Sequence, residues 1–414
     1  MFTFLHAADI HLDSPLRGLD RYEGAPVNEI RGATRKALEN LVDLALRETV
    51  AFVIVAGDLY DGDWPDFDTG LFFVGQMRRL REAGIPVFAV QGNHDAASKI
   101  TRRLPLPDNA YFFPTTAAET RHLEELHVAV HGQSFARQCT TADLAKDYPP
   151  PVPGCFNVGV LHTSMTGREG HDNYAPCSES SLRESGYDYW ALGHVHLREV
   201  LPGTRPTIAY PGNIQGRHIR EAGAKGCLLV HVDNSHEVTT EFQALDVLRW
   251  EVAAVSLEGA ETRDEVLERV AEAFRRVVEA SGGRLVAARV FLTGTTPLAP
   301  DLTANPRQWT AEVRALAVDI GVDSLWIEKV RSEAKEPSES EAIGADDTPA
   351  AEVISIVTEL IGDTSTSESL GLDFDDLRRK LPVESKDVVN GTDVVWWNGV
   401  LREAQAKLLS ELKG

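Results

Sequence analysis

The sequence is poor in cysteine and has no long apolar run. Its four cysteines include no Cys-x-x-Cys pair, so we expect reduced, mostly buried thiols in a cytoplasmic protein. The longest apolar stretches, such as 51–56, are far short of the ~20 residues that span a bilayer. A secretory signal is not expected either, because the start lacks a basic segment and is interrupted by Asp9 and His11. We therefore expect no association with a membrane.

Basic residues are too few for a general nucleic-acid-binding surface. The 414 residues include 41 Lys and Arg against 63 Asp and Glu, which gives a net charge of −22. Proteins that bind nucleic acid usually carry a basic face. The charge argues against a DNA substrate without excluding one, because bound cations would neutralise several of the acidic groups.

The length and composition indicate a folded protein of two or three domains. Residues 1–245 alternate short apolar runs with amphipathic stretches, a pattern typical of a layered α/β domain. The expected strands are 3–8, 51–56, 86–90, 156–161, 189–192 and 227–232, and the expected helices are 28–49 and 68–83.

A smaller α+β domain is expected over residues 246–332. Strand-like segments at 248–257, 285–293 and 324–330 alternate with two helices. Thr262 and Glu265 have the spacing of a capping box that opens the first helix, and the second helix covers 306–320. Residues 333–350 are rich in Glu, Ser, Asp, Ala and Pro, which is typical of a solvated acidic linker.

The C-terminal region, 351–414, is predicted to be helical, and its last helix is amphipathic. Val394, Trp397 and Leu401 begin an apolar stripe that continues along 393–412. An apolar stripe of this kind is expected to pack against another surface. That surface is either another part of this chain or a groove on a partner protein, where helices of this kind dock.

Polar residues directly follow five of the expected strands. Each motif is weak alone, since a Gly-Asp or an Asn-His after a strand is usually part of a turn. Together they predict one metal centre, because ligands gather at the carboxyl ends of strands in an α/β sheet. Asp, His and Asn donors without Cys suit Mn, Fe or Zn. The motifs are Asp9-Ile10-His11, Gly57-Asp58-Leu59-Tyr60-Asp61, Gly92-Asn93-His94-Asp95, His162, and Gly193-His194-Val195-His196.

This set of motifs resembles the calcineurin-like metallophosphoesterase superfamily. The amino-acid sequence of these motifs is similar to that of the SbcD-type DNA-repair nuclease subunits and their YhaO-like relatives. Residues 4–16, FLHAADIHLDSPL, resemble the opening of the YhaO-like branch, and residues 210–218, YPGNIQGRH, resemble a stretch that these nucleases share. The resemblance implies a four-layer β-sandwich flanked by helices at 1–245 and a capping domain at 246–332.

The resemblance also implies a two-metal centre with an acid beside it. The ions would be Mn²⁺, with Fe²⁺, Zn²⁺ or Mg²⁺ as alternatives. His94 would protonate or orient the leaving oxygen, and Asp61 would orient His94 unless it only caps its own turn. The ligands would be Asp9, His11 and His196 for one ion, Asn93, His162 and His194 for the other, and Asp58 bridging the two.

Several polar residues near these motifs have two open interpretations. Asp13 and Asp95 either support the ligands or bond to their own loops. A basic group either meets the phosphates of DNA through charge-assisted hydrogen bonds or forms a solvated loop. The members of this group are Arg17, Arg217, His218 and Arg220.

The function that the resemblance implies is a two-metal phosphodiesterase acting on DNA, as an exonuclease subunit in DNA repair and recombination. Hydrolysis of small phosphoesters or nucleotides uses the same chemistry and suits the acidity better. A DNA-tethering scaffold with secondary catalysis is a third reading. The implied partners are DNA and a coiled-coil ATPase of the SbcC type, with a homodimer as a further expectation. The chain has no G-x-x-x-x-G-K-[ST] motif, so any ATP dependence must come from a partner.

Overall fold

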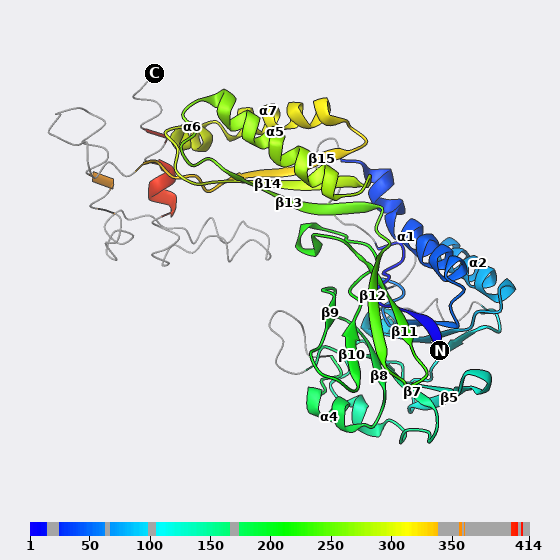
Figure 1. Cartoon of the computed structure of the whole chain (residues 1–414). Coiled ribbons are helices and arrows are strands. Elements are labelled where there is room, and N and C mark those ends of the chain that lie inside the picture. Colours follow the sequence, from blue (N-terminus) through cyan, green and yellow to red (C-terminus); the bar gives the residue numbers. More distant parts are fainter. Residues whose placement is uncertain are drawn as a thin grey trace. The chain divides into compact units, whose positions relative to one another are not determined.

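The computed structural model describes residues 1–14, 25–62, 67–97, 105–165 and 174–337, with short pieces at 356–357, 360, 399–404 and 407–408. The chain divides into two compact units. One unit consists of Met1–Glu251 and Val278–Ala288, and the other of Val252–Val277 and Arg289–Gly414. Figure 1 follows the chain through both units by colour.

The first unit contains two six-stranded sheets (Figure 1). The strands of its first sheet are β1 (Phe2–Ala7), β2 (Phe52–Ala56), β3 (Val87–Val90), β4 (Ala110–Phe112), β11 (Gly226–Val232) and β12 (Val238–Ala244). Their order across the sheet is β12-β11-β1-β2-β3-β4. Neighbours from β1 to β4 pair in parallel, so these strands end at the same edge.

The second sheet has a parallel centre as well. Its strands are β5 (Glu119–Leu123), β6 (Val128–Gly132), β7 (Phe156–His162), β8 (Tyr189–Gly193), β9 (Glu199–Val200) and β10 (Thr207–Tyr210). The order is β5-β6-β7-β8-β10-β9, and β6, β7, β8 and β10 run parallel. The carboxyl ends of β7 and β8 therefore share one edge.

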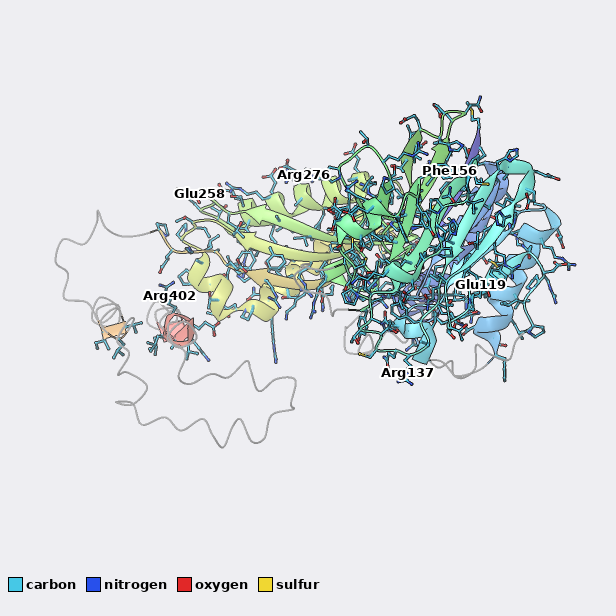
Figure 2. All side chains as sticks on the ribbon, turned by 90° about the horizontal axis from the view of Figure 1, so that it is seen from below. Glu119, Arg137, Phe156, Glu258, Arg276 and Arg402 are labelled. Atoms are coloured by element: carbon cyan, nitrogen blue, oxygen red, sulfur yellow. The ribbon has the colours of Figure 1, made fainter. Side chains whose placement is uncertain are left out.

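Alternating side chains fill the space between the two sheets. Phe4 of β1 stacks on Phe52 of β2 with ring centroids 4.7 Å apart, and Phe156 of β7 belongs to the same buried cluster. Figure 2 labels Phe156 in the first unit. Leu5 and Val53 point to the opposite face of the first sheet, because successive strand residues alternate. There they pack with α1 (Val27–Arg47) and α2 (Asp68–Glu82), which lie side by side in Figure 1.

Short helices cover the outer face of the second sheet. Trp190 and Tyr210 are fully buried there beside Leu182 of α4 (Glu179–Glu184). Leu144 of a 3-10 helix (Leu144–Asp147) packs against the same cluster. Helices, sheet, sheet and helices make up the four layers that the resemblance implied, so the expectation of a layered α/β sandwich is confirmed.

A three-stranded sheet with helices makes up the rest of the fold. Its strands are β13 (Leu248–Ser256), β14 (Leu285–Thr293) and β15 (Leu325–Ser332), in that order. The helices are α5 (Arg263–Ala280), which carries Arg276 of Figure 2, α6 (Ala299–Ala304) and α7 (Pro306–Ile320). The predicted capping box opens α5, because Thr262 and Glu265 each accept the other's backbone N–H at 3.3 Å. Helix α6 was not predicted.

The C-terminal region is described only in short helical pieces. Val357 and Leu401 are buried together, with Leu360 and Val400 packed against them. One residue of the predicted apolar stripe, Leu401, is thus covered by this chain. The rest of the helix predicted over 393–412, and the linker beyond residue 337, lie mostly outside the described residues. Among the described residues, no helix is long and apolar enough to cross a membrane.

Candidate metal centre

The loops after β1 and β2 have an unusual backbone that presents their side chains at the sheet edge. Asp9, His11 and Asp58 have positive φ angles of 50°, 45° and 49°. This conformation is unfavourable for residues with a Cβ and is concentrated at functional sites. Two hydrogen bonds of 3.0 Å hold the loops together, from the Asp9 N–H to the Gly57 carbonyl and from the His11 N–H to the Asp58 carbonyl.

One group of potential ligands consists of Asp9, His11 and His196. Their ligand atoms lie within 4.8 Å of one another. The Nε2 atoms of His11 and His196 are 3.2 Å apart, and His196 Nε2 is 3.6 Å from Asp9 Oδ1. Asp9 also accepts the backbone N–H of His194 at 3.0 Å, which ties the loop after β8 to the loop after β1. The two sheets therefore meet at this group.

A second group contains Asp58, His162 and His194, again within 4.8 Å of one another. His162 Nε2 lies 3.4 Å from Asp58 Oδ2 and 3.0 Å from Asn93 Oδ1. The same Asp58 oxygen is 3.9 Å from His11 Nε2 in the first group. Asp58 thus faces both groups, as a bridging carboxylate must.

The orientation and charge of these side chains fit divalent cations. The Nδ1 atom of His162 lies 2.9 Å from the Ala56 carbonyl, so the ring donates there and directs the Nε2 lone pair into the site. Burial alone would lower the pKa of His162, yet the charge and hydrogen bond of Asp58 raise this pKa to about 9. The donor set therefore favours a positive charge between His162 and Asp58. Oxygen and imidazole donors suit a divalent cation at this place.

His94 forms a third group with His11 and Asp58, with ligand atoms within 4.8 Å of one another, but its side chain is held differently. Its Nδ1 is 2.6 Å from Asp61 Oδ1, and its backbone N–H donates to Asp58 Oδ1 at 2.9 Å. The hydrogen bond to Asp61 raises the pKa of His94, so the imidazole holds its proton more firmly than an isolated histidine. The side chain is 37% exposed, whereas His11 and His162 are buried. His94 can therefore present a protonated Nε2 to a molecule from solvent.

Comparisons with known proteins agree with this geometry. A family model described as calcineurin-like phosphoesterase matches residues 2–198, and one described as metallophosphoesterase YhaO, middle domain, matches residues 250–335. The uncharacterized metallophosphoesterase YhaO of Bacillus subtilis is 37% identical over 298 residues, which cover 71% of this chain and 72% of that protein. The chain belongs to the calcineurin-like metallophosphoesterases, in the YhaO family. It is therefore a hydrolase of phosphoesters.

More distant relatives of this metallophosphoesterase are named for DNA repair. The DNA double-strand break repair protein Mre11 of Methanopyrus kandleri is 26% identical over 81% of this chain and 72% of its own length. The protein of the same name from Sulfurisphaera tokodaii is 25% identical over 63% of this chain and 67% of its own length. Calcineurin-like phosphoesterases bind two divalent metal ions, and the two ligand groups supply the residues that would hold them here.

The Asp61 carboxylate of this metallophosphoesterase contacts side chains from separate loops. Besides His94 it accepts a hydrogen bond from the Ser14 hydroxyl at 2.5 Å and lies 3.4 Å from Arg217 Nη1. Burial opposes its ionisation, but the hydrogen bond from His94 and the neighbouring imidazoles hold the pKa of Asp61 well below its usual range. These contacts favour an orienting role over that of a turn cap.

Glu221 is a buried residue that the sequence analysis missed. Its Oε1 lies 2.6 Å from His196 Nδ1, which fixes the tautomer that leaves Nε2 for a metal. Glu221 Oε2 accepts the Asn213 amide at 3.0 Å and the Arg217 backbone N–H at 2.7 Å. Burial opposes ionisation, yet His196 and Arg217 hold the pKa of Glu221 well below its usual range. The available signal was its position three residues after the stretch 210–218, which resembles the nucleases.

We expect Glu221→Gln to weaken metal binding. The variant keeps the shape of the side chain but loses the charge that orients His196, and losses of this kind typically cost about 10- to 100-fold in metal affinity or activity. Titration of the metal-free protein with Mn²⁺, followed by calorimetry, measures the effect. The exposed Glu237 provides a matched control, since Glu237→Gln should bind Mn²⁺ as the parent does. Equal affinity in both variants would remove Glu221 from the site.

Asp95 supports the ligand loops through their backbone. It accepts the N–H groups of Leu59 at 3.1 Å, Tyr60 at 2.8 Å and Gly92 at 3.0 Å, and so joins the loops after β2 and β3. Burial, together with the charge of Asp58, raises the pKa of Asp95 to about 7. Of the two interpretations of Asp95, the structure supports the one in which it holds the ligand loops in place.

We expect Asp95→Ala to lower the free energy of unfolding by roughly 3 kcal/mol or more, because an unsatisfied buried donor costs about 1–3 kcal/mol and three N–H groups lose their acceptor. Urea denaturation of the metal-free protein measures the change. Asp108→Ala serves as the control, because the Asp108 side chain is 75% exposed and its removal should change little. A loss below roughly 1 kcal/mol would show that water replaces the carboxylate.

The remaining predicted residues differ in their surroundings. Asp13 bonds to Arg35 and accepts the Thr69 hydroxyl at 2.6 Å, so it links α1 to the start of α2 rather than facing the ligands. Arg217 is only 14% exposed, between Asp61 and Glu221. His218 and Arg220 are exposed. Arg17 lies outside the described residues.

Proposed function

We propose that this metallophosphoesterase hydrolyses phosphodiester bonds of DNA, as an exonuclease subunit in repair and recombination. The observation that carries the proposal is the His94–Asp61 pair, at 2.6 Å, beside two ligand groups that the Asp58 carboxylate faces. The leaving group of a DNA phosphodiester is a sugar hydroxyl, which departs readily only if a proton is supplied. The relatives named Mre11 support DNA as the substrate.

The proposed division of labour follows from the contacts. Two divalent ions, held by these ligand groups, would supply Lewis-acid activation of water and would neutralise charge on the phosphate. Asp58 holds both ligand groups together, and Asp9 and Glu221 keep His194 and His196 in place. His94 Nε2 donates its proton to the leaving oxygen while Asp61 holds Nδ1. The proposed metal is Mn²⁺, which the oxygen and imidazole donors of the ligand groups suit, as they also suit Fe²⁺ and Zn²⁺.

DNA contacts are proposed for exposed basic residues close to the site. His218 and Arg220 are exposed and follow the loop that carries Asn213. Arg17, which lies outside the described residues, is proposed from the sequence alone. Residues 246–332 are proposed as a capping domain that positions the strand, and the match of residues 250–335 to the YhaO middle-domain model supports a separate domain there. A cytoplasmic location is part of the proposal, since all four cysteines are free.

A parallel assay in Mn²⁺ tests the substrate. Labelled linear duplex DNA, single-stranded DNA and a chromogenic phosphomonoester are compared, each with the parent and with Asp58→Ala. We expect cleavage of DNA that Asp58→Ala abolishes. The net charge of −22 favours the second candidate function, a phosphatase of small esters or nucleotides. Hydrolysis of the monoester alone would establish that candidate, and no hydrolysis with DNA binding intact would favour a scaffold.

The proposed protein partner is a coiled-coil ATPase of the SbcC type, bound through the C-terminal helix. Truncation after Glu352 removes both Val357 and Leu401, which are buried against each other. Neither residue is therefore left exposed by the loss of the other. We expect the truncated chain to keep metal-dependent hydrolysis and to lose co-purification with the ATPase. A sharp fall in melting temperature would instead show that the helix belongs to this chain's own core. Size-exclusion chromatography of both chains tests the proposed homodimer.

A further inference from the structure

Arg217 lies between two carboxylates of the site. Its Nη1 is 3.4 Å from Asp61 Oδ2, and its Nη2 donates to Glu221 Oε1 at 3.1 Å. The side chain is 14% exposed, Asp61 is 17% exposed and Glu221 is 6% exposed. The guanidinium is therefore enclosed by its two partners instead of extending into solvent.

Each of these carboxylates holds one imidazole by its Nδ1 atom. Asp61 holds the acid His94 at 2.6 Å, and Glu221 holds the metal-ligand candidate His196 at 2.6 Å. Arg217 thus links the part of the site that would supply a proton to the part that would hold a cation. The link runs through one side chain, across loops 156 residues apart in the chain.

The chemistry of arginine suits this place better than that of lysine. Two carboxylates this close repel each other, and a planar guanidinium can donate to both at once in a fixed geometry. The ammonium group of a lysine is a compact charge, so it cannot donate hydrogen bonds to both carboxylates in the fixed geometry of a guanidinium. The backbone N–H of Arg217 also donates to Glu221 Oε2 at 2.7 Å, which fixes the start of the side chain.

We infer that Arg217 is a positioning residue that sets His94 and His196 in register through Asp61 and Glu221, and not a residue that binds the phosphates of DNA. The inference rests on the proposed role of His94 as the acid. Loss of Arg217 should leave the fold and the DNA affinity in place. It should reduce turnover roughly 10- to 100-fold, the usual cost of losing a partner behind a ligand or acid.

Leaving-group dependence tests this role independently of DNA. Two aryl phosphodiesters are compared in Mn²⁺, one with nitrophenolate and one with the more basic phenolate as the leaving group. A poorer leaving group depends more on the proton from His94. Arg217→Ala should therefore lose more activity on the phenyl diester than on the nitrophenyl diester, and Arg217→Lys should recover only part of the loss. A merely structural defect would lower both rates by the same factor.

Arg137 provides the control, because it is exposed and is neither part of the site nor a proposed DNA contact, so Arg137→Ala should keep kcat on both aryl diesters. The exposed Arg220, a proposed DNA contact, provides the contrast. On duplex DNA, Arg220→Ala should raise KM and reduce the slope of log affinity against log salt by about 0.9, the value for one lost phosphate contact. Arg217→Ala should show the reverse pattern, a fall in kcat with an unchanged salt slope.

Mn²⁺ titration supplies a readout besides activity. Arg217→Ala should weaken binding of Mn²⁺ at one of two sites, because Glu221 keeps its bonds to His196 and Asn213 but loses one to the guanidinium. Unchanged Mn²⁺ binding together with equal loss on both aryl diesters overturns the inference. If His94→Ala itself shows no dependence on the leaving group, the proposed acid is wrong. If the activity loss of His94→Ala depends on the leaving group and that of Arg217→Ala does not, only the role of Arg217 is wrong.

Discussion

Replacing Asp58 with alanine is expected to remove both metal ions and nearly all activity. The Asp58 carboxylate faces both ligand sets, at 3.4 Å from His162 Nε2 and 3.9 Å from His11 Nε2. Metal ions supply several kcal/mol of transition-state stabilisation. Their loss should therefore lower the rate on the order of 10³-fold or more. Elemental analysis after gel filtration counts the ions, and a phosphodiester assay gives the rate.

Asp13→Asn is the matched control for this prediction. Asp13 lies four positions after Asp9, but its carboxylate bonds to Arg35 and Thr69 and not to a ligand. This variant should keep two ions per chain and most of the activity. Retention of both ions by Asp58→Ala would show that the two groups bind independently and that the bridging role is wrong.

Replacing His94 with alanine is expected to keep both ions and lose most of the turnover. The imidazole is anchored to Asp61 and stands more exposed than the buried histidines His11 and His162. General acid catalysis of this kind is typically worth ~10²–10⁴-fold. Steady-state kinetics on a phosphodiester gives the loss in kcat, and the metal count per chain shows whether the ligand groups are intact.

Asp61→Asn tests how much the orienting carboxylate contributes to the activity of His94. This variant keeps His94 but weakens the bond to Nδ1, so its loss in kcat should be smaller than that of His94→Ala. The double variant should lose little more than His94→Ala alone, because the two residues act as a unit. A drop of one ion per chain in His94→Ala would instead make His94 a ligand.

The elements that carry the site could be predicted because they are regular and buried. The helices expected at 28–49 and 68–83 agree within two residues with α1 and α2. The polar motifs follow apolar strands directly, and the parallel pairing of β1, β2 and β3 then brings their ends to one edge. Short-range pattern and sheet geometry are sufficient to gather Asp9, Asp58 and Asn93.

Other parts depend on contacts that no local pattern reveals. Strands β5 and β6 were not predicted, since β5 is a polar strand at the edge of its sheet and turns into β6 through His127 at a positive φ of 50°. Glu221 acquires its role only when the chain returns to His196, 25 positions earlier. Arg217 likewise acquires its role only when Asp61, 156 positions earlier in the chain, is brought next to its guanidinium.

The meeting of both sheets at the metal centre has a consequence for the order of synthesis. His11 and His196 are 185 positions apart, yet their ring nitrogens lie 3.2 Å from each other. A ribosome releases the first ligands long before the last, and N-terminal segments begin to fold first. The ion therefore finds a full set of donors only after the second sheet has docked. By mass action, metal binding would then favour the finished sandwich over every partly folded chain.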